Sequence, residues 1–334
     1  MTVAVDTFVA GPSVENETHT PPGRPRSVVR NAGDRVWAAV VGALGGSVLV
    51  VGGVILLSLG KVAAPAFHEL GVGRFLISTD WDPVAEKFGA LPFIYGTVVT
   101  SVVAMVLALP IGVGLALFLS DMAAPRFRSW VAFPVETLAS IPSVVFGLWG
   151  LFVLVPLLRA HVEPWLSRIA GFLPLFQGPP IGLGLLAGGV ILAIMILPTI
   201  ASVTLEVLKT VPLTLREAAL ALGATRWETI RMVVLPYSRA GILGAALLGL
   251  GRALGETMAV TMVIGNSPVI RASLFAPGYS LPAVIANEFA EATGAIHTGA
   301  LAGLGLVLFG TTLLLNSLAR LLMQAVAGTQ RIAV

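Results

Sequence analysis

Two oppositely charged residues stand inside an otherwise apolar stretch of the sequence. Arg252 and Glu256 fall within residues 251–257 and are four positions apart, which would place them on one face of a helix. A guanidinium suits a tetrahedral oxyanion, because its fork donates two parallel hydrogen bonds. Arg252 could therefore attract an anion, while Glu256 holds it in place and keeps the anion from binding too tightly to leave. The alternative is an internal salt bridge that locks helix packing.

A second set of polar residues surrounds Pro142. A proline inside an apolar span frees a backbone carbonyl, and Ser140 and Ser143 could line a polar cavity there. A half-helix that starts after Pro142 could present its N–H groups to an anion. Glu136 would lie near one end of the same span, either paired with Arg252 or at the membrane interface. The alternative is a kink that serves packing alone.

These residues need helices that cross a membrane. The chain has 334 residues, of which 56% are hydrophobic and 11% charged, whereas about 25% is charged in soluble domains. A span needs roughly 20 apolar residues. The stretches that qualify are 36–59, 94–120, 131–157, 181–205, 240–265 and 300–323. We therefore expect an all-α, polytopic membrane protein with six transmembrane helices.

The composition excludes several kinds of chemistry. The sequence has no cysteine, so disulfides and thiolate metal sites are absent. The histidines are far apart and form no cluster with ligand spacing (His19, His68, His161 and His297). We expect no metal, no cofactor, no catalytic residue and no nucleic-acid partner. No Gly-x4-Gly-Lys-Ser/Thr phosphate loop occurs, so any ATP must be bound by another subunit.

Lysine and arginine are distributed unevenly between the two sides of the predicted spans. With the N-terminus inside, the inner segments hold 13 of them and the outer loops hold six. This bias predicts that both termini are cytoplasmic. Residues 1–35 are polar, basic and proline-rich, which predicts a disordered cytoplasmic tail. In the outer segment 60–93, the carboxylates of Asp80, Asp82 and Glu86 could meet a docked partner, but a solvated loop is favoured.

The inner segment 206–239 is predicted to form two short helices. Pro212 opens the first, and Gly223 ends it, since glycine suits a helix C-terminus. Thr225 with Glu228 three residues later has the pattern of a capping box for the second helix. Pro236 then marks the turn into the fifth span.

The same segment resembles the EAA loop of bacterial ABC importer permeases. That motif reads EAA-x3-G-x9-I-x-LP, and it is matched by Glu217, Ala218, Ala219, Gly223, Leu235 and Pro236, with Val233 in place of Ile. The resemblance implies a knob that docks into a groove on a separate ATPase. The alternative is a basic hairpin that lies on anionic lipid headgroups.

Other stretches resemble the PstC-type permease subunit of bacterial phosphate-specific ABC importers. The resemblance covers about residues 93–325 and rests on segments 96–101, 136–147, 251–266 (GRALGETMAVTMVIGN) and 285–292. It implies a type I ABC importer permease fold and a role in transport for Arg252 and Glu256. The implied organisation is a first helix and outer loop at 36–93, followed by a permease core at 94–325.

The resemblance also implies a cell-membrane complex that imports inorganic phosphate. Its other parts would be a homodimeric ATP-binding subunit, a PstA-type permease and an extracytoplasmic phosphate-binding protein. Alternatives that stay open are a permease for sulfate or molybdate, or the sister PstA-type subunit. Further rivals are a secondary transporter or anion channel, an intramembrane enzyme and a structural scaffold.

Overall fold

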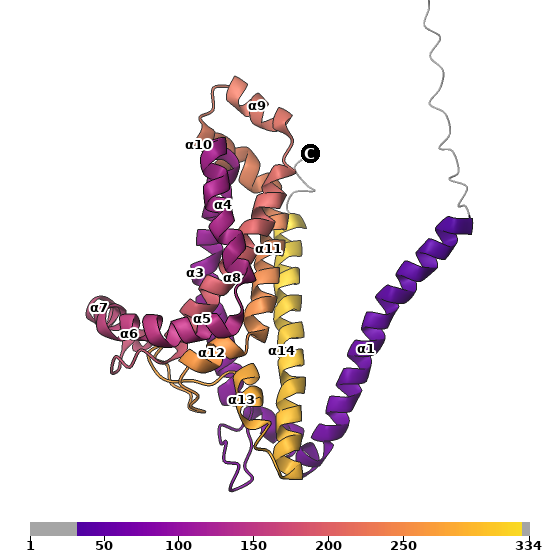
Figure 1. The fold of residues 1–334 in the computed structure, drawn as a ribbon, viewed down its shortest axis with the longest axis vertical. Helices are drawn as coiled ribbons and strands as arrows, with labels where there is room; N and C mark the ends of the chain where they lie inside the picture. Colours follow the sequence, from indigo (N-terminus) through magenta and orange to yellow (C-terminus); the bar gives the residue numbers. More distant parts are fainter. Residues whose placement is uncertain (1–31, 329–334) are drawn as a thin grey trace, which may run out of the picture. The chain divides into compact units, whose positions relative to one another are not determined.

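The computed structural model describes residues 32–328, except the side chains of residues 32, 35, 125–129, 131, 132, 136 and 322–328. This part of the chain is almost entirely helical and has no β-strand (Figure 1). The longer helices are α1 (Ala32–Leu70), α3 (Leu91–Leu117), α4 (Pro125–Ser140), α8 (Leu185–Lys209), α11 (Leu235–Gly255) and α14 (Ala295–Gly328). The shorter ones are α2 (Val72–Ile77), α5 (Ser143–Trp149), α6 (Val155–Leu157), α7 (Glu163–Ala170), α9 (Leu213–Ala221), α10 (Arg226–Thr229), α12 (Met258–Val263) and α13 (Leu281–Glu288).

Wide π-helical turns extend or join several of these helices. They are η1 (Phe118–Met122), η2 (Gly150–Leu154), η3 (Leu158–Val162) and η5 (Ile230–Val234), while η4 (Pro174–Phe176) is a 3₁₀ turn. Six helical segments of the described part are long and apolar enough to cross a membrane. They are Val36–Leu70, Leu91–Met122, Ser143–Ala170, Leu185–Lys209, Arg226–Gly255 and Ala295–Leu321. The prediction of six spans is confirmed, although the third and the fifth begin and end at other residues than predicted.

The chain separates into two compact units, one up to Val54 and one from Ile55 onward. The described part of the first unit is the N-terminal half of α1, whose apolar side chains, such as Trp37 and Leu49, are exposed. The predicted tail at 1–35 lies almost wholly outside the described residues. Everything below concerns the second unit.

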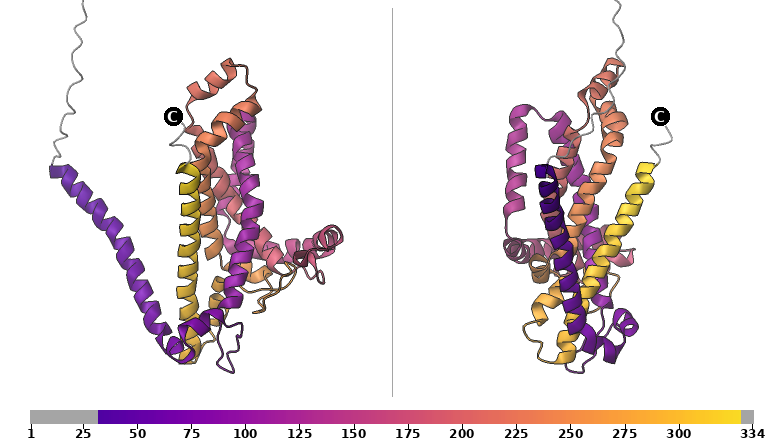
Figure 2. Two further views of the ribbon diagram at one scale, coloured as in Figure 1. Left: turned by 180° about the vertical axis from the view of Figure 1, so that it is seen from behind. Right: turned by 90° about the vertical axis from the view of Figure 1, so that its right-hand side faces the viewer.

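Helix α8 is the centre of this second unit. It is the most deeply buried of the candidate spans, and α3 and α11 pack against it through glycines. A Cβ at Gly189 would lie 2.4 Å from Cγ1 of Val103, and one at Gly249 would lie 2.8 Å from Cγ1 of Ile200. Glycines let helix backbones approach closely where no hydrophobic force drives association. The three helices therefore form the frame from which the functional segments project (Figure 2).

The third membrane-crossing segment differs from the prediction of one span over 131–157. Helix α4 ends at Ser140, and a new helical segment runs from Ser143 to Ala170. Ile141 is extended (φ −69°, ψ 130°), because the ring of Pro142 disfavours the helical conformation of the residue before it. The proline thus separates two helices instead of kinking one.

The outer segment 60–93 is anchored by buried aromatic residues, while the carboxylates expected to be solvated do face outward. The first helix continues to Leu70, and Phe75, Phe88 and Phe93 are buried against α13 and α14. The carboxylates of Asp80, Asp82 and Glu86 are nonetheless exposed. Residues 78–90 of this segment, here called the cap, pack on the helices through Phe88 and Ala90, while the charged side chains of the cap face outward.

A polar contact holds this cap in place. The indole Nε1 of Trp81 donates to Oε2 of Glu288 at 2.9 Å, and Nε2 of His297 lies 3.2 Å from the same oxygen. Trp81 also packs edge-on against the rings of Phe88 and Phe93. Trp81 and Glu288 are 207 residues apart, so no local sequence pattern could have revealed the contact.

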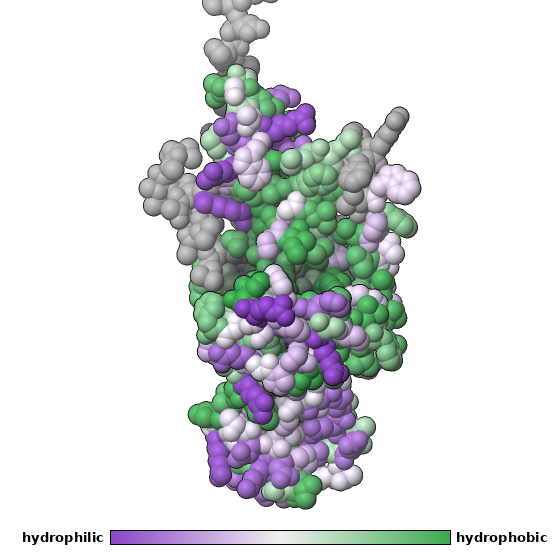
Figure 3. Space-filling view, turned by 90° about the vertical axis from the view of Figure 1, so that its left-hand side faces the viewer, coloured by the Kyte–Doolittle hydropathy of each residue, from purple (hydrophilic) through white to green (hydrophobic). Residues whose placement is uncertain are grey.

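The chain surface has the distribution of polarity that a membrane protein needs. On the face in Figure 3, hydrophobic residues cover much of the middle and upper part, and hydrophilic residues gather at the lower end. A hydrophilic patch interrupts the middle of this face. The apolar zone can lie in hydrocarbon while the polar end remains in water.

Candidate functional site

The EAA motif lies on a short helix at one end of the second unit (Figure 1). Helix α9 carries Glu217, Ala218 and Ala219 and ends at Ala221. Gly223 follows with φ of +88°, a left-handed conformation that glycine adopts without steric cost. The predicted helix and its terminating glycine are therefore confirmed.

The predicted capping box is also confirmed. The backbone N–H of Thr225 donates to Oε2 of Glu228 at 2.7 Å, and the N–H of Glu228 donates back to Oγ1 of Thr225 at 3.3 Å. These two bonds satisfy backbone donors that a helix start leaves without partners. The entry of the chain into α10 is fixed by local sequence alone.

The second helix is not short, and the predicted turn at Pro236 is wrong. Helix α10 continues without interruption through η5 and α11 as far as Gly255. Pro236 lies in the first turn of α11, directly after the π-helical turn η5. A widened turn accommodates the missing N–H and the bulk of the proline ring without breaking the helix. The loop is thus joined rigidly to the fifth span.

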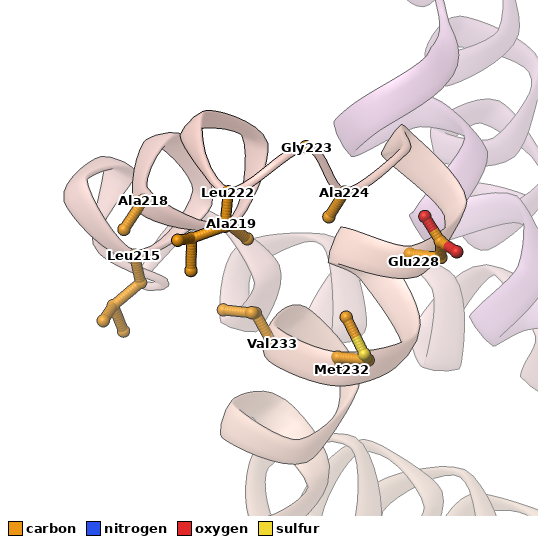
Figure 4. Close-up of a pocket in the computed structure, with 9 residues that line it drawn as sticks. All are labelled: Leu215, Ala218, Ala219, Leu222, Gly223, Ala224, Glu228, Met232 and Val233. Carbon is orange, nitrogen blue, oxygen red and sulfur yellow. The ribbon is translucent and has the colours of Figure 1, made fainter.

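A groove of about 540 Å³ separates α9 from the start of this long helix (Figure 4). Its lining is mostly apolar and consists of Leu215, Ala218, Ala219, Leu222, Gly223, Ala224, Glu228, Met232 and Val233. Leu222 is 90% exposed and Trp227 is 60% exposed, and Glu217 is exposed beside them. Exposed apolar residues gathered in one place on a protein indicate a contact surface.

The intramembrane charges do not share a helix face, contrary to the prediction. Helix α11 ends at Gly255, and Glu256 is extended (φ −71°, ψ 128°). Oε1 of Glu256 accepts the backbone N–H of Ala259 at 3.3 Å. The carboxylate therefore satisfies a donor at the start of α12, as a capping residue does. Residues four apart share a face only within one helix, and α11 ends one residue before Glu256.

Arg252 is exposed on the last turn of α11. Among the residues whose side chains the structure describes, no hydrogen bond or ion pair reaches its guanidinium. The alternative of an internal Arg252–Glu256 salt bridge therefore finds no support in the described part of the chain. A guanidinium in this position can receive a ligand or a residue from another subunit.

The residues around Pro142 lie on elements next to α12. Helix α5 packs on α12 so closely that a Cβ at Gly147 would lie 3.1 Å from Cα of Ala259. Ser143 begins α5 and is half-buried, whereas the hydroxyl of Ser140 donates within α4 to the Thr137 carbonyl at 2.7 Å. Helix α5, which begins at Ser143, therefore lies beside helix α12, whose start donates a backbone N–H to the carboxylate of Glu256. Glu136 lies on α4, and its side chain is outside the described part.

Sequence reasoning missed an ion pair at the base of the EAA helix. Arg216, the residue before the motif, pairs with Asp121 at the end of η1. The two residues are 95 positions apart. Neither a motif nor a periodicity connects them, so only the folded chain reveals the contact.

Comparison with known proteins places these features in a family. Residues 108–328 match the family model described as binding-protein-dependent transport system inner membrane component. A protein of Mesorhizobium japonicum named phosphate transport system permease protein PstC is 48% identical over 297 residues, which cover 88% of this chain and 90% of that protein. The protein of the same name from Haemophilus influenzae is 45% identical and covers 83% and 88% respectively.

The fold is also found among solved structures. A chain in the crystal structure of a bacterial alginate ABC transporter, in complex with an alginate-bound periplasmic protein, superposes with a TM-score of 0.57 at 16% identity. The match covers 88% of this chain and 99% of that one. With six membrane-crossing segments, the present chain is a multi-pass inner-membrane protein and a permease subunit without a catalytic role of its own. It belongs to the binding-protein-dependent transport system inner membrane components, and within them to the PstC-type phosphate transport permeases.

Proposed function

We propose that this chain is the transmembrane permease subunit of an ATP-driven importer of inorganic phosphate. The relatives that share almost half of its residues are named phosphate transport permeases. The chain is matched to them over most of its length, including both the EAA loop and the segment around Arg252. This breadth supports a common substrate as well as a common fold.

The expected partners follow from the family to which the chain belongs. Helix α9 and its groove would dock on a homodimeric ATP-binding subunit, which hydrolyses ATP. A PstA-type permease would complete the pathway, and an extracytoplasmic phosphate-binding protein would deliver the substrate. The bias of lysine and arginine supports cytoplasmic termini, which would put α9 on the same side as the ATPase.

Arg252 is the observation that carries the substrate proposal. Arg252 lies within the membrane-crossing segment Arg226–Gly255. A charge in hydrocarbon costs up to about 2.5–3.5 kcal/mol on insertion scales, so such a residue faces an aqueous path or a neighbouring protein. The guanidinium would bind phosphate by donating two parallel N–H hydrogen bonds to its oxygens. Glu256, with one oxygen used at the start of α12, would limit how long the anion stays. Ser143, Ser140 and Glu136 would line the same path on α5 and α4.

The structure suggests how ATP would move this site. ATP binding would close the ATPase pair and displace α9. Because α10, η5 and α11 form one continuous helix that ends three residues after Arg252, a tilt at the loop would reach the charged end of α11 directly. The outward-open state would take phosphate from the binding protein, and hydrolysis would restore the resting state.

Substitution of Arg252 tests the proposal. In the reconstituted complex, Arg252→Gln should lower ATP-dependent phosphate uptake by about tenfold or more, because a charge-assisted hydrogen bond contributes about 1.5–3 kcal/mol. Arg252→Lys should retain part of the uptake, since it keeps the charge but loses the fork. Arg271→Gln is the matched control, because Arg271 is exposed outside the predicted spans. Normal uptake by Arg252→Gln, with the ATPase still bound, would make Arg252 a structural residue.

A further inference from the structure

Arg216 joins three elements at the base of the EAA helix. Its Nη1 donates to Oδ1 of Asp121 at the end of η1, and its Nη2 donates to the Leu208 carbonyl at 2.8 Å. The side chains of Arg216 and Asp121 are only 16% and 13% exposed. One guanidinium thus connects α9 with η1, which continues α3, and with the last turn of α8.

This contact is unusual for α9, whose other side chains are largely exposed. Helix α9 has no fully buried residue, and its apolar side chains Leu213, Leu215 and Leu220 are exposed. Covalently, α9 is attached through a short turn to α8 on one side and through Gly223 to α10 on the other. Without Arg216, the described part of the chain offers α9 no polar side-chain link to α3.

A small apolar cluster lies at the ends of the same helices. Ala116 of α3, Leu208 of α8, Val211 of the following turn and Val234 of η5 are all buried together. The cluster ties the helix ends to one another but includes no residue of α9. The ion pair therefore extends this fixed base to α9.

We propose that the Asp121–Arg216 pair, here called the base clamp, transmits the displacement of α9 to α3. Both are positioning residues, and the inference rests on the proposed ATP-driven function. Helix α3 packs along α8 through Gly112 and Gly189, so the clamp would move the α3–α8 frame together with the continuous α10–α11 helix. Without the clamp, α9 would still dock on the ATPase, but only the α11 side would follow.

The chemistry of the clamp fits transmission better than stability. A partly buried ion pair gains little net free energy, because desolvation offsets most of the attraction. Its value lies in geometry: the planar fork holds a carboxylate and a carbonyl at fixed positions at once. Asp121 also sits in a π-helical turn, a feature that often marks functional positions in helices.

The ratio of phosphate imported to ATP hydrolysed tests the clamp. Both rates are measured in the same vesicles with wild type, Asp121→Asn, Arg216→Gln and the double variant. Each single variant should lower the ratio by about tenfold, within the range of typical coupling between distant sites. The double variant should be no worse than either single variant, since all three remove one interaction. The ATPase should stay bound in every case.

A nearby ion pair provides the matched control. Lys209 and Glu206 pair at 2.6 Å near the end of α8, but their side chains are 47% and 69% exposed. Glu206→Gln should leave the ratio unchanged. If Asp121→Asn fails to accumulate, Arg216→Lys takes its place and should give an intermediate ratio, because an ammonium lacks the fork.

Three results would overturn the proposal. They are a wild-type ratio in the single variants, losses that multiply in the double variant, and release of the ATPase from the complex. The last would show that the pair only shapes the docking surface. If the wild type imports another oxyanion, the proposed substrate fails, and the ratio measured with that ion still tests the clamp.

Discussion

At the scale of single residues, the position of a helix end decides what each charge can do. Helix α11 ends at Gly255. The carboxylate of Glu256 therefore accepts a hydrogen bond at the start of α12 and does not pair with Arg252. Arg216 shows the opposite case, because Nη1 and Nη2 of its guanidinium donate to groups from two other elements. The same residue type is thus exposed without a described partner at Arg252, where we propose that it receives the anion, and is paired with other elements at Arg216.

Glu288 gives a prediction at this scale. Glu288→Ala removes the acceptor shared by Trp81 and His297, and leaving such donors unpaired costs about 1–3 kcal/mol. The cap at 78–90 should then open more often. Hydrogen exchange of its amides should speed up by roughly 5- to 150-fold, which is that free energy expressed as an equilibrium constant.

Glu291→Ala is the control for this measurement, because Glu291 lies one turn away and is exposed. Exchange in that variant should match the wild type. Equal exchange rates in Glu288→Ala and Glu291→Ala would show that aromatic packing alone holds the cap.

At the scale of elements, glycines determine how closely the helices pack. Two of the three glycines in helix α3 lie in contrasting surroundings. A Cβ at Gly96 would lie 2.2 Å from the backbone oxygen of Tyr279, whereas one at Gly114 would meet nothing within 4 Å. Next to Gly96, the hydroxyl of Thr97 accepts the N–H of Leu281 at 2.9 Å. This end of α3 is therefore fitted to the segment before α13.

Alanine substitutions at the two positions should have different effects. Gly96→Ala forces backbone apart and should destabilise the fold by about 1–3 kcal/mol. Gly114→Ala should be neutral or stabilise the helix by up to about 1 kcal/mol. Thermal unfolding in one detergent compares them, with roughly 2–4 °C expected per kcal/mol. Equal melting temperatures would contradict the close contact at Gly96.

Local sequence patterns predicted the elements that local forces determine. Gly223 and the pair Thr225–Glu228 act within a few residues, and the structure has them as predicted. The break at Gly255 left a weaker signal, since apolar residues on both sides suggested one span over 240–265. The contacts of Asp121 with Arg216 and of Trp81 with Glu288 join distant parts of the chain, so no local pattern specifies them.

At the scale of the whole molecule, the proposed function separates the permease, which this chain would supply, from the ATPase, which a partner would supply. The chain has no phosphate loop for ATP, and its EAA helix presents exposed apolar residues at one end of the second unit. The charged end of α11 lies at the other end of a continuous helix that starts beside this loop. In the proposed mechanism, a partner subunit hydrolyses ATP and displaces α9, and the continuous helix through α11 transmits this displacement to the anion site.

The most direct test of this account is phosphate uptake by vesicles that contain the complete complex, with ATP inside or outside and the binding protein supplied externally. The account predicts that labelled phosphate accumulates only when ATP is on the side of α9, and that labelled sulfate does not accumulate. Accumulation without ATP would contradict coupling through the EAA loop and favour a channel or secondary transporter. Sulfate uptake in place of phosphate would contradict the proposed substrate.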